Sequence, residues 1–288
     1  MNSARDPQAF EAQRSRLTRL AYRMLGSVAE AEDVVQDAWL RWAHAREDVV
    51  DPSAWLVRVA SRLCLDRMRT AKSRREIYVG PWLPEPLIEE LSVDPVDRAE
   101  DVSVAFLLAL ERLTPLERAV FLLHDVFDED YAAVAQALGR TEAATRQLAA
   151  RARAHVAQAR PRFNVSQDEA QRLTNAFLAA TVRGDLSALS DLLAHDAEMI
   201  TDGGGKRSAA LRRLIGRDDI VRLLQGLAWR RGDAMPLSMR SVRINGYPGL
   251  ILQWVDGPVT VAFQPGAAGK IAGIYLVRNP DKLTKIMP

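Results

Sequence analysis

The segment from Thr114 to Val156 restricts the possible fold more than any other part of this chain. It opens with Thr114-Pro115-Leu116-Glu117, in which a hydroxyl can cap a helix, a proline can take the first helical position and a glutamate can bond back to the cap. A second helix is predicted from Tyr131 to Leu138, where Gly139 can take the left-handed conformation that ends it. Thr141 can then cap a third helix. Two helices joined by so short a glycine turn indicate a helix-turn-helix.

The last helix of this segment has one apolar and one polar side. Its apolar stripe consists of Leu148, Ala149, Ala152 and Val156. Arg146 and Gln147 lie outside the stripe, where arginine can bond guanine and glutamine can bond adenine in the major groove. Arginines farther along are placed for phosphates, which give affinity but no sequence information. An ordinary helical hairpin with a solvated basic face is the alternative. The predicted DNA-contacting set is Glu142, Arg146, Gln147, Arg151 and Arg153.

Length and composition exclude several classes of protein. A chain of 288 residues with 48% hydrophobic and 26% charged residues has room for two or three globular domains. No apolar run is long enough for a membrane span and the N-terminus lacks the apolar core of a secretion signal, so we expect a cytoplasmic protein without membrane contact. Cys64 is the only cysteine and the four histidines lack ligand spacing. We therefore expect no metal site and no cofactor.

The distribution of charge is more informative than the net charge of +2. Residues 58–75 hold seven basic residues against one acidic, and residues 140–162 hold six against one. Between them, residues 85–101 hold seven acidic residues and one basic residue. Two positive surfaces on either side of a negative tether suit a protein that contacts a nucleic-acid duplex at two separate places.

Helical spacing also fills the first part of the chain. Apolar residues follow it from Leu17 to Leu25, up to Gly26-Ser27, and again from Val34 to Trp42. Asp51-Pro52 predicts the start of a further helix, and Cys64, at the border of its apolar stripe, is predicted to be a core residue. Arginines gather on another side of that helix. We expect an all-helical bundle with one basic side.

Several stretches in this bundle carry a family resemblance. They are Gly26-Ser27 followed by Ala31-Glu32-Asp33-Val34-Val35-Gln36-Asp37-Ala38-Trp39-Leu40-Arg41, then Trp55-Leu56, and then Leu65-Asp66-Arg67-Met68-Arg69. Together they resemble region two of the extracytoplasmic-function sigma factors, bacterial proteins of the sigma-70 family. The segment from Thr114 to Val156 is similar to region four of the same family. The order and separation of the two segments agree as well, so the match is more specific than either motif alone.

The resemblance implies contacts with bacterial core RNA polymerase and with promoter DNA. The helix from Glu32 to Arg41 is expected to dock on the clamp helices of the polymerase. The contact residues predicted there are Asp33, Gln36, Asp37 and Arg41. The loop from His44 to Pro52 and the next helix are expected to handle the melted promoter element, where unstacked bases need a pocket and nearby cations. The cations predicted there are Arg58, Arg62 and Arg69. A basic face that serves solubility alone is the alternative.

A proline-rich tether follows the bundle. Gly80-Pro81-Trp82-Leu83-Pro84-Glu85-Pro86 has three prolines in seven residues and should run extended and fairly stiff. The acidic stretch after it resembles a disordered connector, which in the sigma architecture would thread through polymerase channels built for nucleic acid. A plain interdomain spacer is the competing interpretation. Trp82 argues against a spacer, because so large an apolar ring usually has a surface to bury against.

The pattern changes after Pro161. Helices are predicted at about 167–182 and 186–193. The predicted strands are Ser238 to Asn245, Leu250 to Val255, Val259 to Phe263 and Ile271 to Val277, broken at Gly246-Tyr247-Pro248-Gly249, Asp256-Gly257-Pro258 and Gly266-Ala267-Ala268-Gly269. Helices followed by a meandering sheet indicate an α+β domain. This order of elements looks like the SnoaL-like cone-shaped fold.

Two short motifs of this last part join the tether in a second resemblance. Asp202-Gly203-Gly204-Gly205-Lys206 lacks the spacing of a Walker loop and is predicted to be a flexible turn. Asn279 to Leu283 indicates a turn followed by a helical stub. With the tether motif, the two resemble the marks of SigJ-like sigma factors, which carry a fused SnoaL-like tail. For that group the resemblance implies a tail that regulates the sigma core in place of a separate anti-sigma factor. The regulatory contacts predicted are Trp82, Leu83, Pro84, Asp202, Lys206, Asn279, Asp281 and Lys282.

The expected protein is thus multidomain. It has two all-α sigma domains, residues 1–77 and 103–163, the second a helix-turn-helix, joined by a proline-rich and then acidic linker, residues 78–102. An α+β SnoaL-like domain, residues 164–288, follows. The predicted function is that of a sigma factor that directs core polymerase to promoters, without catalytic residues.

Two alternatives remain at this point. The first is a DNA-binding regulator that acts without polymerase. The second is an enzyme or a small-molecule sensor that uses a pocket in the last domain, with His195, Asp196 and Asp202 as the candidate acid-base residues. His195-Asp196 is expected to be a solvated pair at a helix end.

Overall fold

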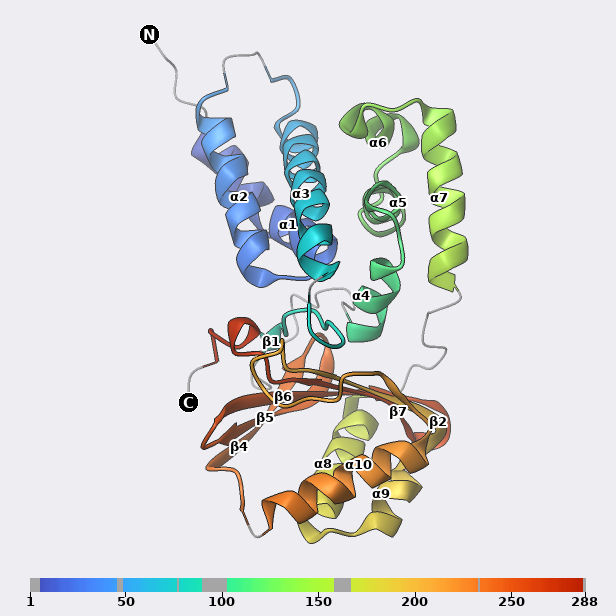
Figure 1. Ribbon diagram of the computed structural model, residues 1–288. Helices are drawn as coiled ribbons and strands as arrows, with labels where there is room; N and C mark the ends of the chain where they lie inside the picture. The colour runs from blue at the N-terminus through green and yellow to red at the C-terminus, as the bar shows by residue number, and fades with distance from the viewer. Residues whose placement is uncertain are drawn as a thin grey trace. The chain divides into compact units, whose positions relative to one another are not determined.

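The computed structural model describes residues 6–45, 49–76, 78–89, 103–157, 167–232 and 234–286, and the chain forms two compact units. Unit 1 comprises Met1–Ile77 and Leu107–Arg160, and unit 2 comprises Tyr78–Phe106 and Pro161–Pro288. Figure 1 gives the element labels used below. The first predicted helical domain, residues 1–77, coincides with the first segment of unit 1, and residues 107–160 of the second also fall in unit 1. The predicted linker belongs with the C-terminal domain in unit 2.

The first part of unit 1 consists of α1 (Pro7–Leu25), α2 (Val28–Ala43) and α3 (Pro52–Glu76). The cap predicted at Asp51 is confirmed, and side-chain caps also start the other two helices. The Ser27 side chain accepts from the Glu30 amide at the start of α2, and Asp51 accepts from the Ala54 amide at the start of α3. Gly26, with φ 70°, ends α1 in the left-handed conformation that glycine favours. Cys64 is fully buried, as predicted.

The second part of unit 1 is the predicted helix-turn-helix. It contains α4 (Val104–Glu111), α5 (Pro115–Phe121), the π-helical turn η2 (Leu122–Val126), α6 (Tyr131–Leu138) and α7 (Glu142–Ala157). Thr114 and Glu117 form the reciprocal capping box at the start of α5, and Gly139 ends α6 with φ 64°. Ala149, Ala152 and Val156 of α7 are buried. The helix-turn-helix is therefore confirmed, with η2 as an addition that the sequence did not predict.

The two parts of unit 1 pack on each other, because α3 lies against α5 and α6. A buried arginine of α5 links them: Arg118, 2% exposed, donates to the backbone carbonyl of Met24 at 2.7 Å and to that of Leu110 at 3.0 Å. Burial lowers the pKa of Arg118 to about 9, so this guanidinium is still a cation at pH 7. On the other side of the contact, Arg16 of α1 pairs with Glu129 at 2.5 Å.

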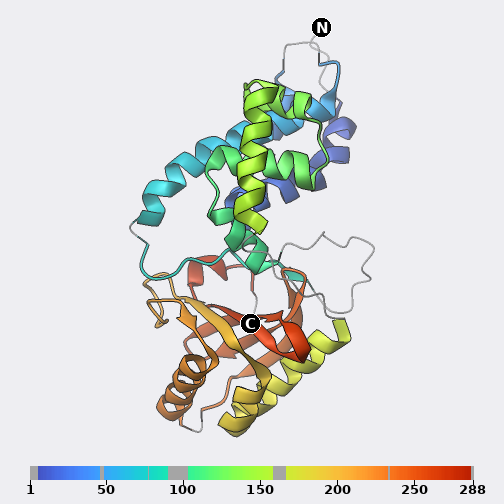
Figure 2. The ribbon, with the colours of Figure 1, turned by 90° about the vertical axis from the view of Figure 1, so that its right-hand side faces the viewer.

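Unit 2 is built on a seven-stranded sheet in the order β1-β4-β5-β6-β7-β2-β3. Its strands are β1 (Ile88–Glu89), β2 (Leu193–Asp202), β3 (Leu214–Ile215), β4 (Ser238–Ile244), β5 (Tyr247–Trp254), β6 (Gly257–Pro265) and β7 (Ile271–Val277). Neighbouring strands are antiparallel except β2 and β7, which are parallel. The helices α8 (Gln167–Arg183), α9 (Leu186–Leu192) and α10 (Arg217–Arg231) lie on one side of the sheet (Figures 1 and 2).

The α+β class of unit 2 is confirmed, but several local predictions need correction. His195 and Asp196 are exposed as expected, yet they lie within β2 and not at a helix end, because the parallel pairing with β7 extends the strand back to Leu193. The turn predicted at 246–249 is shorter, since Tyr247 already pairs with Ile244 and Pro248 and Gly249 belong to β5. The sequence reasoning missed β2, β3 and α10, and also β1, which the connector contributes to the sheet.

Candidate nucleic-acid interface and linker clamp

The exposed side of α7 presents the residues predicted to contact bases. Arg146 and Gln147 are both exposed near the start of the helix. Arg146 pairs with Glu142 one turn earlier at 2.7 Å, and its guanidinium lies 5.2 Å from the centroid of the Tyr131 ring. The contact with Glu142 is a surface ion pair of small energetic value, so Arg146 can exchange it for a guanine edge.

The two arginines predicted to meet phosphates also have partners within unit 1. Arg153 donates to Asp125 at 2.6 Å and to the Tyr131 hydroxyl at 3.1 Å. The hydrogen bond that Arg153 donates to Asp125 raises the pKa of Arg153 above its ordinary value. Arg151 lies 3.6 Å from Glu117. Both side chains are about half exposed, so a phosphate has to compete with a carboxylate for each of them.

A basic hollow of about 550 Å³ lies on α2 and α3, between the predicted polymerase and DNA contacts. It brings together Arg58 and Arg62, predicted for the melted element, and Arg41, predicted for polymerase. His44, Trp55 and Val59 complete its lining. Cations around an aromatic ring are what an unstacked base with its phosphates requires. Arg69 does not join this hollow; it is exposed and pairs with Asp66 at 2.8 Å.

The remaining residues predicted to contact polymerase lie along α2. Asp33 and Gln36 are exposed, and Arg41 is exposed at the end of the helix. Asp37 is half-buried and accepts from Arg67 of α3 at 2.7 Å. Arg67 also donates to the Glu30 carbonyl, so it ties α2 to α3 and leaves Asp37 less available than the other three.

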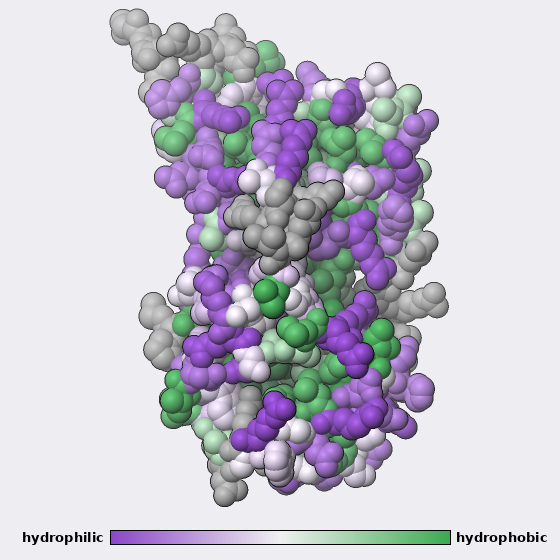
Figure 3. Space-filling model, in the orientation of Figure 1, coloured by the Kyte–Doolittle hydropathy of each residue, from purple (hydrophilic) through white to green (hydrophobic). Residues whose placement is uncertain are grey.

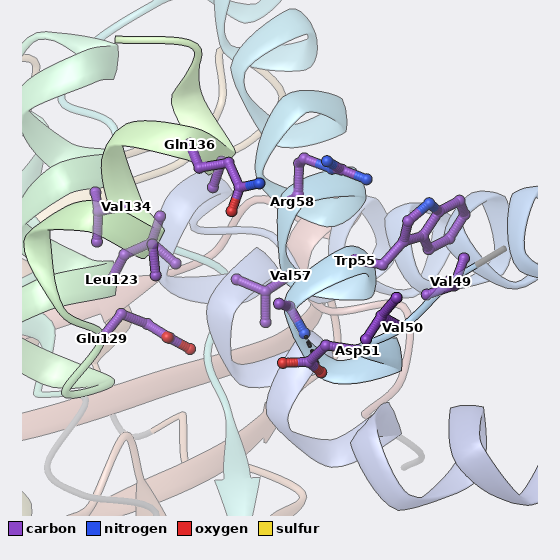
Figure 4. A pocket seen from close by; sticks show the side chains of 13 residues that line it. Val49, Val50, Asp51, Trp55, Val57, Arg58, Leu123, Glu129, Val134 and Gln136 are labelled. Atoms are coloured by element: carbon purple, nitrogen blue, oxygen red, sulfur yellow. Dashed lines mark hydrogen bonds between the residues drawn. The ribbon is translucent and has the colours of Figure 1, made fainter. Parts of the chain in front are cut away.

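A second hollow, of about 260 Å³, runs between α3 and the helix-turn-helix (Figure 4). Val57 and Arg58 line it from α3, while Leu123 and Gln136 line it from η2 and α6. Arg58 therefore borders both hollows. With the two parts of unit 1 in this arrangement, the helix-turn-helix packs beside the surface predicted for the melted element.

In unit 2, the tether motif and the two motifs of the C-terminal domain meet in a structure that we call the linker clamp, formed by Tyr78, Trp82, Leu83, Asp202, Asn279 and Lys282. At its centre, the fully buried carboxylate of Asp202 accepts from the Tyr78 hydroxyl at 2.5 Å and from the Leu83 amide at 2.8 Å. Asn279 donates to the same Tyr78 hydroxyl at 2.8 Å. Burial, together with the bond to Asp202, raises the pKa of Tyr78 and keeps its hydroxyl a donor.

The positive charge of Lys282 completes the clamp by pairing with Asp202. Its ammonium lies 2.7 Å from Asp202 and also donates to the Leu83 carbonyl. It sits 4.3 Å from the Trp82 ring centroid and 5.0 Å from that of Tyr78, so the same cation also gains contacts with two aromatic faces. Side-chain exposures of 12% for Lys282 and 0% for Asp202 make this a buried ion pair. Trp82 therefore has the contact surface that its size predicts.

The glycine motif is needed for the close approach of its neighbours. Gly204 has φ 61°, and a Cβ there would collide with the Asn279 side chain. Gly205 has φ 72°, and its Cβ would lie 3.1 Å from Val79 of the connector. The predicted turn is confirmed. Lys206, after the glycines, pairs with Asp281 at 2.6 Å in an exposed position at the edge of the clamp.

Tyr78 is the clamp residue that the sequence reasoning missed. It precedes the recognisable tether motif by several residues, and only its aromatic ring beside Gly80 could have drawn attention to it. Pro84, which was predicted as a contact, is buried next to Leu83 and lines a small gap with Tyr275 and Val277 of β7. The acidic residues 90–102 lie outside the described part of the chain. No helix in the described part has the length and apolar character needed to cross a membrane.

Comparisons with known proteins agree with this geometry. Residues 9–74 match the model of Sigma-70 region 2 and residues 103–156 that of Sigma-70, region 4. The chain is 41% identical over 287 residues to the ECF RNA polymerase sigma factor SigJ of Mycobacterium tuberculosis, covering 96% of this chain and 92% of that protein. It is 39% identical over 199 residues to the probable ECF RNA polymerase sigma factor SigI of the same species, covering 66% and 68%.

The crystal structure of Mycobacterium tuberculosis SigJ superposes with a TM-score of 0.79 and 36% identity, over 97% of this chain and 98% of that one. A SnoaL-like protein of unknown function from Burkholderia thailandensis aligns with 39% of this chain and 97% of its own at 16% identity and a TM-score of 0.31. The fold class of unit 2 rests on its own helices and strands and on the SigJ match. The chain belongs to the extracytoplasmic-function RNA polymerase sigma factors of the sigma-70 family, which initiate transcription with core polymerase.

Proposed function

We propose that this sigma factor is regulated by its own C-terminal domain, which holds the connector between the two sigma regions through the linker clamp, and that no separate anti-sigma factor is required. The single observation that carries the proposal is the buried Asp202–Lys282 pair, which binds both the amide and the carbonyl of Leu83. A connector held by its backbone on the C-terminal sheet is not free to extend elsewhere.

This arrangement determines which contacts the connector loses when it leaves the clamp. Connector residues 78–89 donate and accept hydrogen bonds in unit 2 and add β1 to its sheet. In a sigma factor, the connector is expected to enter channels of the polymerase. The connector must then leave the clamp. Asp202 and Lys282 must then either be resolvated or pair with each other without the connector. The clamp therefore opposes assembly of the active complex and restrains transcription.

Promoter contacts are proposed for the two basic surfaces. Arg146 and Gln147 read base edges, with Glu142 at the same helix start, while Arg151 and Arg153 contact phosphates. Arg58 and Arg62 hold the melted strand at the basic hollow, and Arg69 contributes from farther along α3. The polymerase contacts are Asp33, Gln36, Asp37 and Arg41.

Unit 1 in the arrangement described here is a resting form in this proposal. Promoter elements that are separate along the duplex cannot both be reached while the helix-turn-helix lies on α3, so the contacts of Arg118 and Arg16 across unit 1 have to open on binding. Each of these contacts is polar, so water or DNA can supply new hydrogen-bonding partners when the contact opens.

Catalysis is not part of the proposed function. Of the three residues considered for acid-base chemistry, His195 and Asp196 lie exposed on β2, and the Asp202 carboxylate is occupied by three hydrogen-bond donors of the clamp and the turn after it and by Lys282. We propose a protein that works with polymerase in the cytoplasm.

Run-off transcription with purified core polymerase tests the regulation. Lys282→Gln in the full chain removes the clamp cation, whereas Lys206→Gln removes an exposed cation that pairs with Asp281 and serves as the matched control. We expect more transcript from Lys282→Gln than from the parent chain and no change from Lys206→Gln. A chain ending near Phe163 should also differ from the full chain. Equal transcription by all four proteins would refute regulation by the C-terminal domain.

A further inference from the structure

A largely apolar cavity lies within unit 2, between the sheet and its helices. Its volume is about 310 Å³. Apolar side chains line it from α8, α10 and five strands, among them Phe177, Leu224, Leu227, Leu252, Val261 and Leu276. Cavities of this size and character are the usual form of a binding site for a small organic molecule, here at the lower end of the size range.

The polar groups of the lining narrow the chemistry of the occupant. The hydroxyls of Thr181 and Thr201 are satisfied by backbone carbonyls. Arg278 also lines the cavity; it donates to the Ser208 carbonyl at 2.8 Å and to Asp256 at 2.6 Å, but its buried Nε has no hydrogen-bond partner among the residues that the structure describes. An orphaned buried donor on a cation is costly, and an acceptor oxygen of a ligand would satisfy it.

Charge favours an anionic acceptor at this point. Asp256 is shared between Arg278 at 2.6 Å and Arg207 at 3.2 Å, so one carboxylate faces two guanidinium groups. Arg230 of α10 also belongs to the lining. A carboxylate pairs well with a guanidinium in both geometry and charge. The remaining apolar lining then suits a hydrocarbon chain.

The cavity and the linker clamp lie on opposite faces of the same strands. Side chains alternate between the two faces of a strand. On β2, Thr201 lines the cavity and the next residue, Asp202, is the centre of the clamp. After β7, Arg278 lines the cavity and the next residue, Asn279, bonds Tyr78. The amides of Arg278 and Asn279 both donate to the Asp202 carbonyl, at 2.7 and 3.0 Å, which joins these two points directly.

We infer that unit 2 binds a small carboxylic acid with an apolar chain, its carboxylate on Arg278 and its chain in the cavity, and that this ligand tightens the linker clamp across β2 and β7. The inference rests on the proposed function for its regulatory consequence, but not for the binding itself. A filled cavity orders Thr201 and Arg278 and with them the adjacent Asp202 and Asn279. The ligand thus stabilises the form in which the connector is held.

Titration calorimetry of the full chain with decanoate tests the site, with decanol and decylamine as probes of the same chain length. We expect saturable 1:1 binding of decanoate, and weaker binding of decanol and decylamine by about tenfold or more, the value of a hydrogen bond to a charged group. Arg278→Met should cost decanoate a similar factor while leaving decanol unchanged, and Arg212→Met, an exposed arginine outside the lining, should change nothing.

Leu227→Trp, which adds a larger side chain to the cavity lining from α10, provides an independent test of the site if Arg278→Met does not fold. It should abolish binding of all three probes. Equal binding of the three probes, or decanoate binding that neither variant changes, would overturn the assignment of the site, as would the absence of saturable binding.

Hydrogen exchange of the Leu83 amide, which donates to Asp202, tests the coupling. At a decanoate concentration 100-fold above its dissociation constant, mass action can slow opening by up to about 100-fold, and we expect at least about tenfold. Unchanged exchange in the presence of bound decanoate would overturn the coupling. Failure of the proposed function is distinguishable, because Lys282→Gln would then leave transcription unchanged while decanoate still bound.

Discussion

Replacement of the clamp carboxylate, Asp202→Asn, has a large predicted effect on how the connector is held. Asparagine has the same shape, but the neutral amide leaves the Lys282 ammonium buried at 12% exposure without its counter-charge. Removing one partner of a buried ion pair costs about 3–5 kcal/mol. The free energy that protects the connector from opening should fall by about that amount.

Hydrogen exchange of the Leu83 amide measures this free energy. Since 1.36 kcal/mol corresponds to a factor of ten, a loss of about 3–5 kcal/mol should speed up exchange by roughly 160- to 5,000-fold, up to the limit set by the residual stability of unit 2. The matched control is Asp281→Asn. It breaks the Lys206 pair, whose side chains are 55% and 62% exposed, and such pairs contribute only about 0–1 kcal/mol.

The double variant Asp202→Asn with Lys282→Gln separates charge from packing. If the buried charge is the cause, the second substitution should recover part of the loss, because no unpaired ammonium remains. Equal exchange rates in Asp202→Asn and Asp281→Asn would refute the reasoning, since the buried pair would then be worth no more than the exposed one.

The remaining predictions concern unit 1. Arg146→Ala should weaken promoter binding by about 1–3 kcal/mol and relax specificity at one base position in a binding-site selection, whereas a uniform loss over all sequences would contradict base contact. Arg153→Ala should lower the slope of log affinity against log salt by about one, and an unchanged slope would exclude a phosphate contact. Burial raises the pKa of Cys64 from its ordinary value of 9.0 to about 12, so the folded chain retains a proton that the unfolded chain loses. Stability in urea titrations should be unaffected below pH 9 and should fall as the pH rises from 9 towards 12, and Cys64→Ser should remove that fall. Arg16→Met should loosen unit 1 by removing the Glu129 pair, seen as a larger radius in solution scattering, and an unchanged radius would show that the pair does not hold the two parts together.

Local signals in the sequence predicted the helical unit well. Thr114, Gly139 and Ser27 act through bonds to residues within three or four positions, so their effect is readable without knowing the fold. The helix-turn-helix and the first helices follow from such residues and from the apolar stripes between them. The π-helical turn at Leu122–Val126 has no comparable signal, and no glycine or proline marks it.

The sheet of unit 2 was harder to predict because its pairings connect distant segments. The strand Leu193–Asp202 is defined by parallel pairing with Ile271–Val277. Its exposed His195 and Asp196 interrupt the apolar pattern from which a strand is predicted. Ile88–Glu89 becomes a strand only because β4 is there to pair with it. The clamp residues other than Tyr78 were singled out through the family resemblance, whereas their geometry around Asp202 depends on contacts across more than a hundred residues of chain.

Hydrogen exchange of the connector in the free sigma factor and in its complex with core polymerase tests the central claim most directly. In the free protein, the Leu83 amide should be protected by its bond to Asp202. In the complex with core polymerase and promoter DNA, that protection should be lost, because the connector has to leave the C-terminal sheet. Protection of Leu83 that is equally strong in both states, in a complex that transcribes, would contradict the account.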